Sequence, residues 1–324
     1  MILKSDNDGV ITVSFLLMPE YAMMALLSAI EPMRVANRMA EREVFRWQLI
    51  TMDENQVLAS NGLALHKTRS IHEVPEPRNL FICSSFQPEK YIKECVLTWL
   101  RKLKRHGAVL GAMDTGSYLL AAADLLNRHR FTLHWEATPA FKEVHPTLEV
   151  SNELFEIDRN IITCAGGTSA IDLLLYIIQN DFSPKLAITV CEQFIKNGIR
   201  HKSDKQRINL AARLKVHHPR MLRVLEELEK NLLSPLSTNE LADHAHLSIR
   251  QLERLFRDHF NDTPSSYYLI LRLERAQQLL KDTHLRISGV SIACGFNTAA
   301  NFSRCYRKHY NCNPREERKA HCIC

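Results

Sequence analysis

The sequence predicts a two-domain protein in which an α/β domain is followed by an all-α domain. Three observations support this prediction. Strand and helix patterns alternate over residues 1–196, strand patterns stop after residue 221, and the charge changes sign between the two parts. The 324 residues are enough for two domains of ordinary size. We expect an α/β domain over 1–196, a basic linker region over 197–220 and a helical domain over 221–320.

Five apolar runs in the first part have the length of buried strands, and helical patterns separate them. The expected strands are residues 9–18, 45–52, 79–85, 109–113 and 159–167. The expected helices are residues 23–41, 88–107, the segment after Gly116, 168–181 and 184–198. This alternation predicts a parallel sheet with helices on both faces, which binds ligands beyond the carboxyl ends of its strands. At that edge we expect four segments to meet, namely 18–22, 84–87, 114–117 and 164–169.

Composition and cysteine usage narrow the class of protein. A hydrophobic fraction of 45% and a charged fraction of 24% are ordinary for a soluble globular chain. No segment approaches the roughly 20 uncharged apolar residues that span a bilayer, and no signal-peptide pattern opens the chain. Nine scattered cysteines, an odd number without a paired framework, indicate reduced thiols. We therefore expect a cytoplasmic protein without a membrane partner.

We expect neither a cofactor nor a metal. The terminal residues 321–324, His-Cys-Ile-Cys, offer three metal donors. Three clustered donors without a fourth make a poor zinc site, so we favour a disordered tail over a metal site there.

The net charge of +6 hides an asymmetry along the chain. Residues 1–195 hold 19 Lys and Arg against 23 Asp and Glu, a net charge of −4. Residues 196–324 hold 23 against 13, a net charge of +10. A basic rear domain indicates a polyanionic partner, although a solvated basic surface is the alternative that charge alone leaves open.

Residues 237–260, STNELADHAHLSIRQLERLFRDHF, have the layout of a helix–turn–helix. Ser237 with Glu240 and Ser248 with Gln251 form two capping boxes, which predict two helices separated by a turn at 246–247. The second helix has an apolar face of Leu252, Leu255, Phe256 and Phe260. Its opposite face carries donors suited to guanine and adenine edges, namely Arg250, Gln251, Arg254 and Arg257.

Residues 286–310 repeat this layout, with a turn at Gly295 and a helix after Asn297. Phe302, Cys305, Tyr306 and Tyr310 are expected to face inward, and the outward polar residues are Thr298, Asn301, Arg304 and Arg307. The helix expected over 264–283 is about 30 Å long. A spacer of that length would hold two recognition helices close to one DNA turn apart, roughly 34 Å. A plain helical bundle is the alternative interpretation.

Residues 221–318 resemble the DNA-binding domain of the AraC/XylS transcription regulators. The segments LSIRQLERLFRDHF, LRLERAQQLL and IACGFNTAANFSRCYRKHYNCNPREER carry the resemblance in the family's order and spacing. It implies sequence-specific binding to double-stranded DNA, a homodimer and RNA polymerase as a further partner. Two residues depart from the pattern. His246 replaces a small turn residue, and Gly289 lies inside a helix, where it costs up to about 1 kcal/mol relative to Ala.

The first 185 residues or so resemble class I glutamine amidotransferase-like domains of the PfpI/ThiJ type, which implies a flavodoxin-like sheet. The segments FLLMPEYAMMALLSAIEPMRVAN, FTLHWEATPAF and CAGGTSAIDLLLYII carry this resemblance. Enzymes of this type hold a cysteine at the sharp strand-to-helix turn, a histidine after the next strand and a glutamate near the first loop. Here Asp114, His134 and Met23 occupy these places. A carboxylate is a poor substitute for a thiolate nucleophile, so we expect no enzymatic activity.

The same turn is a candidate ligand site of a sensor domain. A carboxylate at 114, a second at 136 and an indole at 135 suit a cationic ligand through ion pairing and cation–π contact. Regulators resembling this one respond to arginine-like amino acids, betaine or carnitine. The expected ligand residues are Asp114, Thr115, His134, Trp135, Glu136 and Phe86. The plainer alternatives are a core tryptophan, a packing histidine and a helix-capping glutamate.

Two functions follow from these patterns. The first is a DNA-binding transcription regulator controlled by a small metabolite, a cationic or zwitterionic amine or amino acid. The alternative is an amidotransferase, PfpI-like hydrolase or glyoxalase fused to a DNA-binding module. The residue at position 114 discriminates between them, because a cysteine there would have preserved the enzyme.

Overall fold

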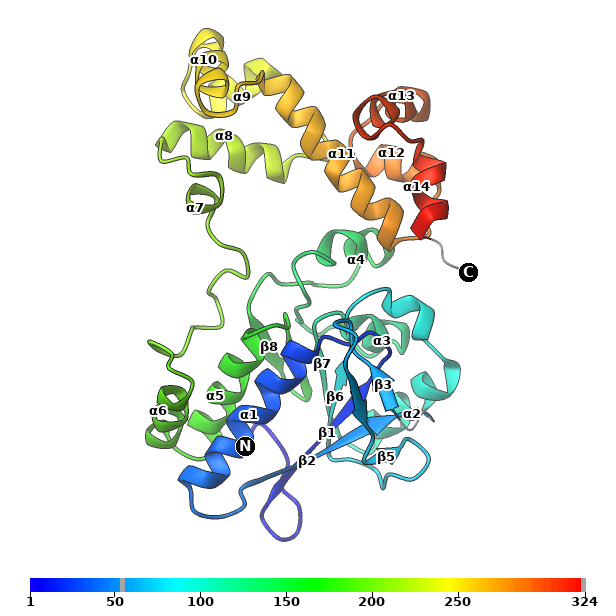
Figure 1. The fold of residues 1–324 in the computed structure, drawn as a ribbon, viewed down its shortest axis with the longest axis vertical. Coiled ribbons are helices and arrows are strands. Elements are labelled where there is room, and N and C mark those ends of the chain that lie inside the picture. Colours follow the sequence, from blue (N-terminus) through cyan, green and yellow to red (C-terminus); the bar gives the residue numbers. More distant parts are fainter. Residues whose placement is uncertain (53–55, 322–324) are drawn as a thin grey trace. The chain divides into compact units, whose positions relative to one another are not determined.

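The computed structural model describes residues 1–52 and 56–321, and the chain divides into two compact units, Met1–Gln206 and Arg207–Cys324 (Figure 1). The division lies inside the linker region that the sequence predicts, and the predicted domain limits stay a prediction. The terminal Cys322 and Cys324, discussed above as metal donors, lie outside the described residues. None of the helices in the described ranges is both long enough and apolar enough to cross a membrane.

The first unit is built on a seven-stranded, mostly parallel sheet with the strand order β5-β2-β1-β6-β7-β9-β8. This confirms the predicted fold class. Every pair of neighbours is parallel except β8 and β9. The strands are β1 (Ile11–Leu17), β2 (Phe45–Thr51), β5 (Arg69–Ser70), β6 (Asn79–Cys83), β7 (Val109–Met113), β8 (Phe155–Asp158) and β9 (Ile161–Cys164). A separate short hairpin joins β3 (Gln56–Leu58) and β4 (Ala64–His66).

Helices cover both faces of this sheet and bury two apolar cores (Figure 1). One face carries α1 (Met23–Met39), α5 (Ser169–Asp181) and α6 (Pro184–Gln193). The other carries α2 (Glu94–Arg105), α3 (Ser117–Ala122) and α4 (Thr138–Val144). The central strands β6 and β7 are buried along their whole length, as expected for parallel strands covered on both faces.

The structure corrects the sequence prediction in three places. Strand β8 was not predicted, and it is antiparallel because the two-residue turn at Arg159 and Asn160 leads straight back into β9. The helix predicted over 88–107 is two elements, a 3-10 turn (Pro88–Tyr91) and then α2, because Ile92 and Lys93 are extended. The short strands β3, β4 and β5 and the short helix α4 carried too weak a pattern to be predicted.

The second unit is all helical and contains two helix–turn–helix motifs, as predicted. The first consists of α9 (Thr238–His244) and α10 (Ile249–Phe260), the second of α12 (Ile287–Ala293) and α13 (Ala299–Tyr310). Figure 1 shows α11 (Pro264–Asp282) between the two motifs. Three further helices complete the unit, α7 (Leu210–Leu214), α8 (Pro219–Lys230) and α14 (Pro314–His321).

Local signals determine where the helices of the first motif begin. Both capping boxes are present, because the Ser237 and Ser248 side chains accept from the backbone and their own N–H groups donate to Glu240 and Gln251. His246 takes a φ of 53° at the turn, a conformation that costs a residue other than glycine some strain. Leu252 and Phe256 are buried against α8, α9 and α11, as the apolar face predicts.

The turn of the second motif is fixed to the rest of the unit. Arg272 on α11 donates from Nε to the Cys294 carbonyl oxygen at 2.7 Å and from Nη2 to that of Gly295 at 2.6 Å. Its guanidinium carbon lies 4.2 Å from the centre of the Phe296 ring, within cation–π range. Gly295 has a φ of 71° and packs on the loop before α9.

We expect Gly295→Ala to destabilise the second unit. A Cβ at this position would lie 2.6 Å from Pro235 Cδ and 2.7 Å from the Leu232 carbonyl oxygen, and the positive φ adds about 1–2 kcal/mol for an L-residue. Gly289→Ala is the matched control, because Gly289 is helical and its Cβ would have only ordinary contacts, so it should stabilise by up to about 1 kcal/mol. Urea unfolding followed by circular dichroism measures both; equal shifts would contradict this account of the turn.

Candidate ligand site and nucleic-acid interface

Four segments meet at the carboxyl edge of the sheet, as the sequence predicts. The Met18 N–H donates to the Cys83 carbonyl oxygen at 3.0 Å, and Tyr21 pairs with Ser85 as an isolated bridge. The Thr115 hydroxyl donates to the Ser85 carbonyl oxygen at 2.6 Å. The Asp114 N–H donates to the Cys164 carbonyl oxygen at 3.1 Å. The loops that follow β1, β6, β7 and β9 therefore form one site.

Asp114 occupies the sharp turn between β7 and α3 with a φ of 60°, the strained backbone typical of such turns. Its carbonyl oxygen accepts from the His134 N–H at 3.2 Å, which places the loop containing His134 beside it. A Cβ on Gly166 would lie 2.8 Å from Asp114 Oδ2, so the carboxyl group packs on a turn that only glycine fits. That glycine has a φ of 88°.

The Asp114 carboxyl group is nearly buried, with 9% of the residue exposed. Burial raises the pKa of Asp114 to about 7, the nearby charge of Glu136 adds to the rise, and a hydrogen bond from the Thr115 backbone opposes it. Close to neutral pH this group is therefore neither fully ionised nor fully protonated. A bound cation would favour the ionised form.

The remaining predicted ligand residues surround Asp114 unequally. The His134 and Trp135 ring centres are 5.5 Å apart, and His134 Nδ1 lies 4.0 Å from Glu136 Oε2. Burial lowers the pKa of His134, with the Glu136 charge opposing, so this ring is neutral at pH 7. Trp135 is 38% exposed and is not a core residue. Phe86 is 60% exposed, and its neighbour Ser85 accepts the Thr115 hydrogen bond at the site.

Two thiols lie behind the site, and neither fits the role of a nucleophile. Cys83 and Cys164 end β6 and β9 and are buried. Burial raises the pKa of Cys83 well above its ordinary value and that of Cys164 to about 12, so both stay protonated at neutral pH. Met23, in the place of the enzymes' glutamate, is buried and accepts a 3.7 Å hydrogen bond from the Tyr21 hydroxyl at Sδ.

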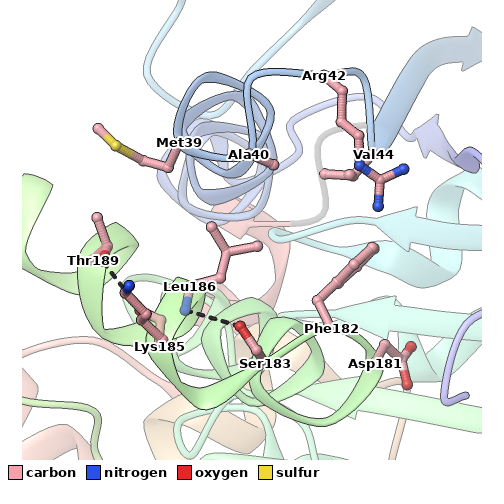
Figure 2. A pocket seen from close by; sticks show the side chains of 10 residues that line it. All are labelled: Met39, Ala40, Arg42, Val44, Asp181, Phe182, Ser183, Lys185, Leu186 and Thr189. Atoms are coloured by element: carbon pink, nitrogen blue, oxygen red, sulfur yellow. Dashed lines mark hydrogen bonds between the residues drawn. The ribbon is translucent and has the colours of Figure 1, made fainter.

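A separate cavity of about 540 Å³ lies near the opposite edge of the sheet, where α1 ends and α6 begins. Figure 2 shows Arg42 and Lys185 among the side chains that line it, over an apolar floor that includes Leu186 and Phe182. None of the predicted ligand residues belongs to this cavity.

The eight predicted DNA-contacting residues are all exposed. On α10 they are Arg250, Gln251, Arg254 and Arg257, and on α13, with its N-cap, they are Thr298, Asn301, Arg304 and Arg307. The opposite faces are buried through Leu252 and Phe256 in one motif and Phe302 and Tyr306 in the other.

Several acceptor atoms on these surfaces are already used within the protein. Gln251 Oε1 accepts from the Ser248 N–H at 2.9 Å, and Thr298 Oγ accepts from the Asn301 N–H at 3.2 Å. Asn301 Oδ1 accepts from Arg304 Nη2 at 2.9 Å. With the four other arginines, the two surfaces offer donors to a partner. The predicted capping box already implies that the Gln251 oxygen is engaged, whereas the sequence pattern did not reveal the bonds of Thr298 and Asn301.

Two helix–turn–helix motifs with exposed basic helices define a DNA-binding protein, and a doubly wound α/β unit precedes them in the chain. Comparison with known proteins identifies the family. A model described as a helix-turn-helix domain matches residues 241–320, and one described as the DJ-1/PfpI family matches residues 13–180.

Full-length relatives share both parts. The chain is 45% identical to the HTH-type transcriptional regulator CdhR of Pseudomonas aeruginosa over 304 residues, which covers 94% of this chain and 90% of that protein. It is 37% identical to the regulator GbdR of the same species, over 97% of this chain and 86% of the relative. A ThiJ/PfpI family protein from Pseudomonas syringae shares the fold, with 18% identity, a TM-score of 0.51 and coverage of 73% of this chain and 89% of that one.

The chain therefore belongs to the AraC-type transcriptional regulators that carry an amino-terminal DJ-1/PfpI domain. Both resemblances that the sequence motifs predicted are confirmed, and the protein is a DNA-binding transcriptional regulator.

Proposed function

We propose that the Asp114 site binds a metabolite with a cationic or zwitterionic amine and that this binding controls how the second unit binds DNA. One observation carries the proposal: a nearly buried carboxyl group occupies the turn where related enzymes hold their nucleophile. An unpaired buried carboxylate is costly, and a bound cation would offset that cost. The half-exposed Trp135 and the Glu136 carboxylate suit a quaternary or guanidinium group.

We propose no catalytic function for this site. Amide or aldehyde chemistry of the PfpI type needs a nucleophile activated as a thiolate, and position 114 supplies a carboxyl group. The neighbouring Cys83 and Cys164 are buried thiols with raised pKa values, so they do not replace it. The relatives compared above carry the names of regulators and not of enzymes.

For the DNA interface we propose target sites whose bases present mainly hydrogen-bond acceptors in the major groove. Bidentate recognition of adenine requires an amide that donates and accepts, whereas guanine presents two acceptors in the major groove. Gln251 and Asn301 already use their side-chain oxygens within the protein, which favours their nitrogens as the groups offered to DNA. The helix α11 has 19 residues, about 28 Å, close to the spacing of successive major-groove segments. A second copy of the chain and RNA polymerase, in the cytoplasm, are the further partners that the family resemblance implies.

The affinity for a cationic probe should depend on pH. Asp114 pairs with a cation only when it is ionised, so the affinity for glycine betaine, L-carnitine or L-arginine should rise about tenfold per pH unit up to about pH 7 and then level off. Isothermal calorimetry with the full chain between pH 5 and pH 8 measures this. At the acid end of the range binding should take place with release of a proton.

Asp114→Asn provides the test of the carboxyl group, because asparagine keeps the shape and tolerates the positive φ. The variant should bind the probes weakly and at a level that does not change with pH. A full-strength affinity in the variant, or no affinity of the wild-type chain for any of the three amines at pH 8, would contradict the proposed ligand class.

A further inference from the structure

Residues 196–206 connect the first unit to the DNA-binding unit and contain neither a helix nor a strand. We call this segment the exit strap. Although the sequence indicates only a basic linker region, the strap is bonded to the first unit at both ends. Each attachment lies next to a backbone segment that touches Asp114.

The first attachment is an ion cluster on α5. Asp172 is fully buried and accepts at Oδ1 from Lys196 Nζ at 2.8 Å and from the Arg200 N–H at 3.0 Å. Its Oδ2 accepts from Arg200 Nε and Nη2 at 2.9 and 2.6 Å. All four hydrogen bonds of this carboxylate therefore hold the strap, and a buried charge of this kind strongly disfavours loss of its partners.

The Arg200 guanidinium extends this cluster toward the ligand site. Its Nη2 also donates to Thr168 Oγ1 at 2.9 Å. Thr168 directly follows Gly166 and Gly167, the turn on which the Asp114 carboxyl group packs. The group that would contact a ligand is thus separated from the strap by one short turn.

The second attachment is Gln206, the last residue of the unit. Its Nε2 lies within hydrogen-bond distance of the carbonyl oxygens of Leu133 at 3.1 Å and Glu153 at 2.9 Å and of Thr132 Oγ1 at 3.0 Å. Leu133 precedes His134, whose N–H donates to the Asp114 carbonyl oxygen. Between the two ends, the Leu154 N–H donates to the Lys202 carbonyl oxygen at 2.8 Å.

We propose that the exit strap transmits the state of the Asp114 site to the DNA-binding unit, with Arg200 and Gln206 as positioning residues. The proposal rests on the proposed function, in which this site binds the controlling ligand. A ligand that pairs with the Asp114 carboxyl group and displaces it also shifts the turn at 166–167, the backbone at 133–134, or both. Either shift alters hydrogen bonds that hold the strap, and so biases it between an attached and a released state.

Tryptic cleavage of the full-length chain provides a test that needs no ligand. The strap contains four cleavage sites, after Lys196, Arg200, Lys202 and Lys205, and an attached strap is protected. Thr168→Val deletes the hydrogen bond from Arg200 that links the first attachment to the turn at 166–167, and Gln206→Leu removes the second attachment. The change at Thr168 is small, because this residue is exposed and its side chain does not cap α5. Each variant should accelerate cleavage within the strap about two- to tenfold, the effect of one net hydrogen bond. Thr189→Val is the matched control, since it deletes a similar hydrogen bond in α6, and it should leave the rate unchanged.

The coupling itself is measured with Asp114→Asn. In the wild-type background this variant should change the rate of strap cleavage about fivefold, a value within the range of coupled networks. In the Thr168→Val/Gln206→Leu double variant the same change should have no effect. Equal rates for the wild-type chain and Asp114→Asn, or an undiminished effect in the double variant, would overturn the strap proposal.

This outcome is independent of the proposed ligand class. Glycine betaine, L-carnitine and L-arginine could all fail to bind while Asp114→Asn still alters strap cleavage, which would contradict the ligand class and support the strap. If a probe binds the double variant with wild-type affinity and still changes DNA affinity to the wild-type extent, the strap is not the transmitting element and the ligand site stands.

Discussion

Arg254→Ala should weaken binding of the full-length chain to its specific DNA site by about 1–3 kcal/mol, the contribution of a bidentate contact between arginine and guanine. Arg254 is exposed at the end of the amino-terminal half of α10, on the face opposite the buried Leu252 and Phe256. Residues in the amino-terminal part of a recognition helix approach base edges most closely. Because the contact reads a base, the loss should be large for the specific site and small for random duplex.

Arg257→Ala is the comparison within the same helix. Arg257 lies in the last turn of α10, so we expect it to contact a phosphate. Its loss should weaken specific and random DNA alike and reduce the slope of log affinity against log salt by about one. Fragments selected from genomic DNA supply the specific site, and fluorescence anisotropy over a range of salt gives both quantities. If the two variants lost specific and random affinity in the same proportion, α10 would not be the reading helix.

The elements of the second unit could be predicted closely because their signals are local. Ser237 and Ser248 mark helix starts through contacts three residues away, and the apolar face of α10 is visible in twelve residues. The first unit has equally clear signals in its long apolar runs. Strand β8 was missed because its turn, Arg159 and Asn160, lacks the glycine that usually marks a two-residue hairpin.

The candidate site was predictable in its position but not in its chemistry. The apolar run over 109–113 and the turn after it place Asp114 at the edge of the sheet. The pKa of Asp114 depends on burial, and its carboxyl group packs on Gly166, which is distant in sequence. The attachment of Arg200 to Asp172 likewise joins residues 28 positions apart, and a basic segment gives no signal of such a partner. Local patterns therefore predict where the site lies, whereas its chemistry depends on contacts between residues that are far apart in the sequence.

Asp114→Asn should stabilise the first unit at neutral and alkaline pH. The pKa of Asp114 is raised from 3.8 to about 7 by burial, so the folded chain holds this proton when the unfolded chain has lost it. Between about pH 4 and pH 7 the free energy of unfolding therefore falls as the pH rises, by about 1.4 kcal/mol per pH unit and about 4 kcal/mol in total. Asparagine has no proton to lose, so the variant should lack this contribution and exceed the wild type above pH 7.

The difference between the two proteins isolates this contribution, because every other titrating group is common to both. All three tryptophans, Trp47, Trp99 and Trp135, belong to the first unit, so urea unfolding followed by their fluorescence reports on that unit alone. Asp124→Asn is the matched control, since Asp124 has the same backbone conformation, with a φ of 59°, but is exposed. If the free energies of unfolding of the wild type and Asp114→Asn ran parallel from pH 5 to pH 8, the carboxyl group would be ionised throughout this range. The site would then keep its negative charge without a bound cation.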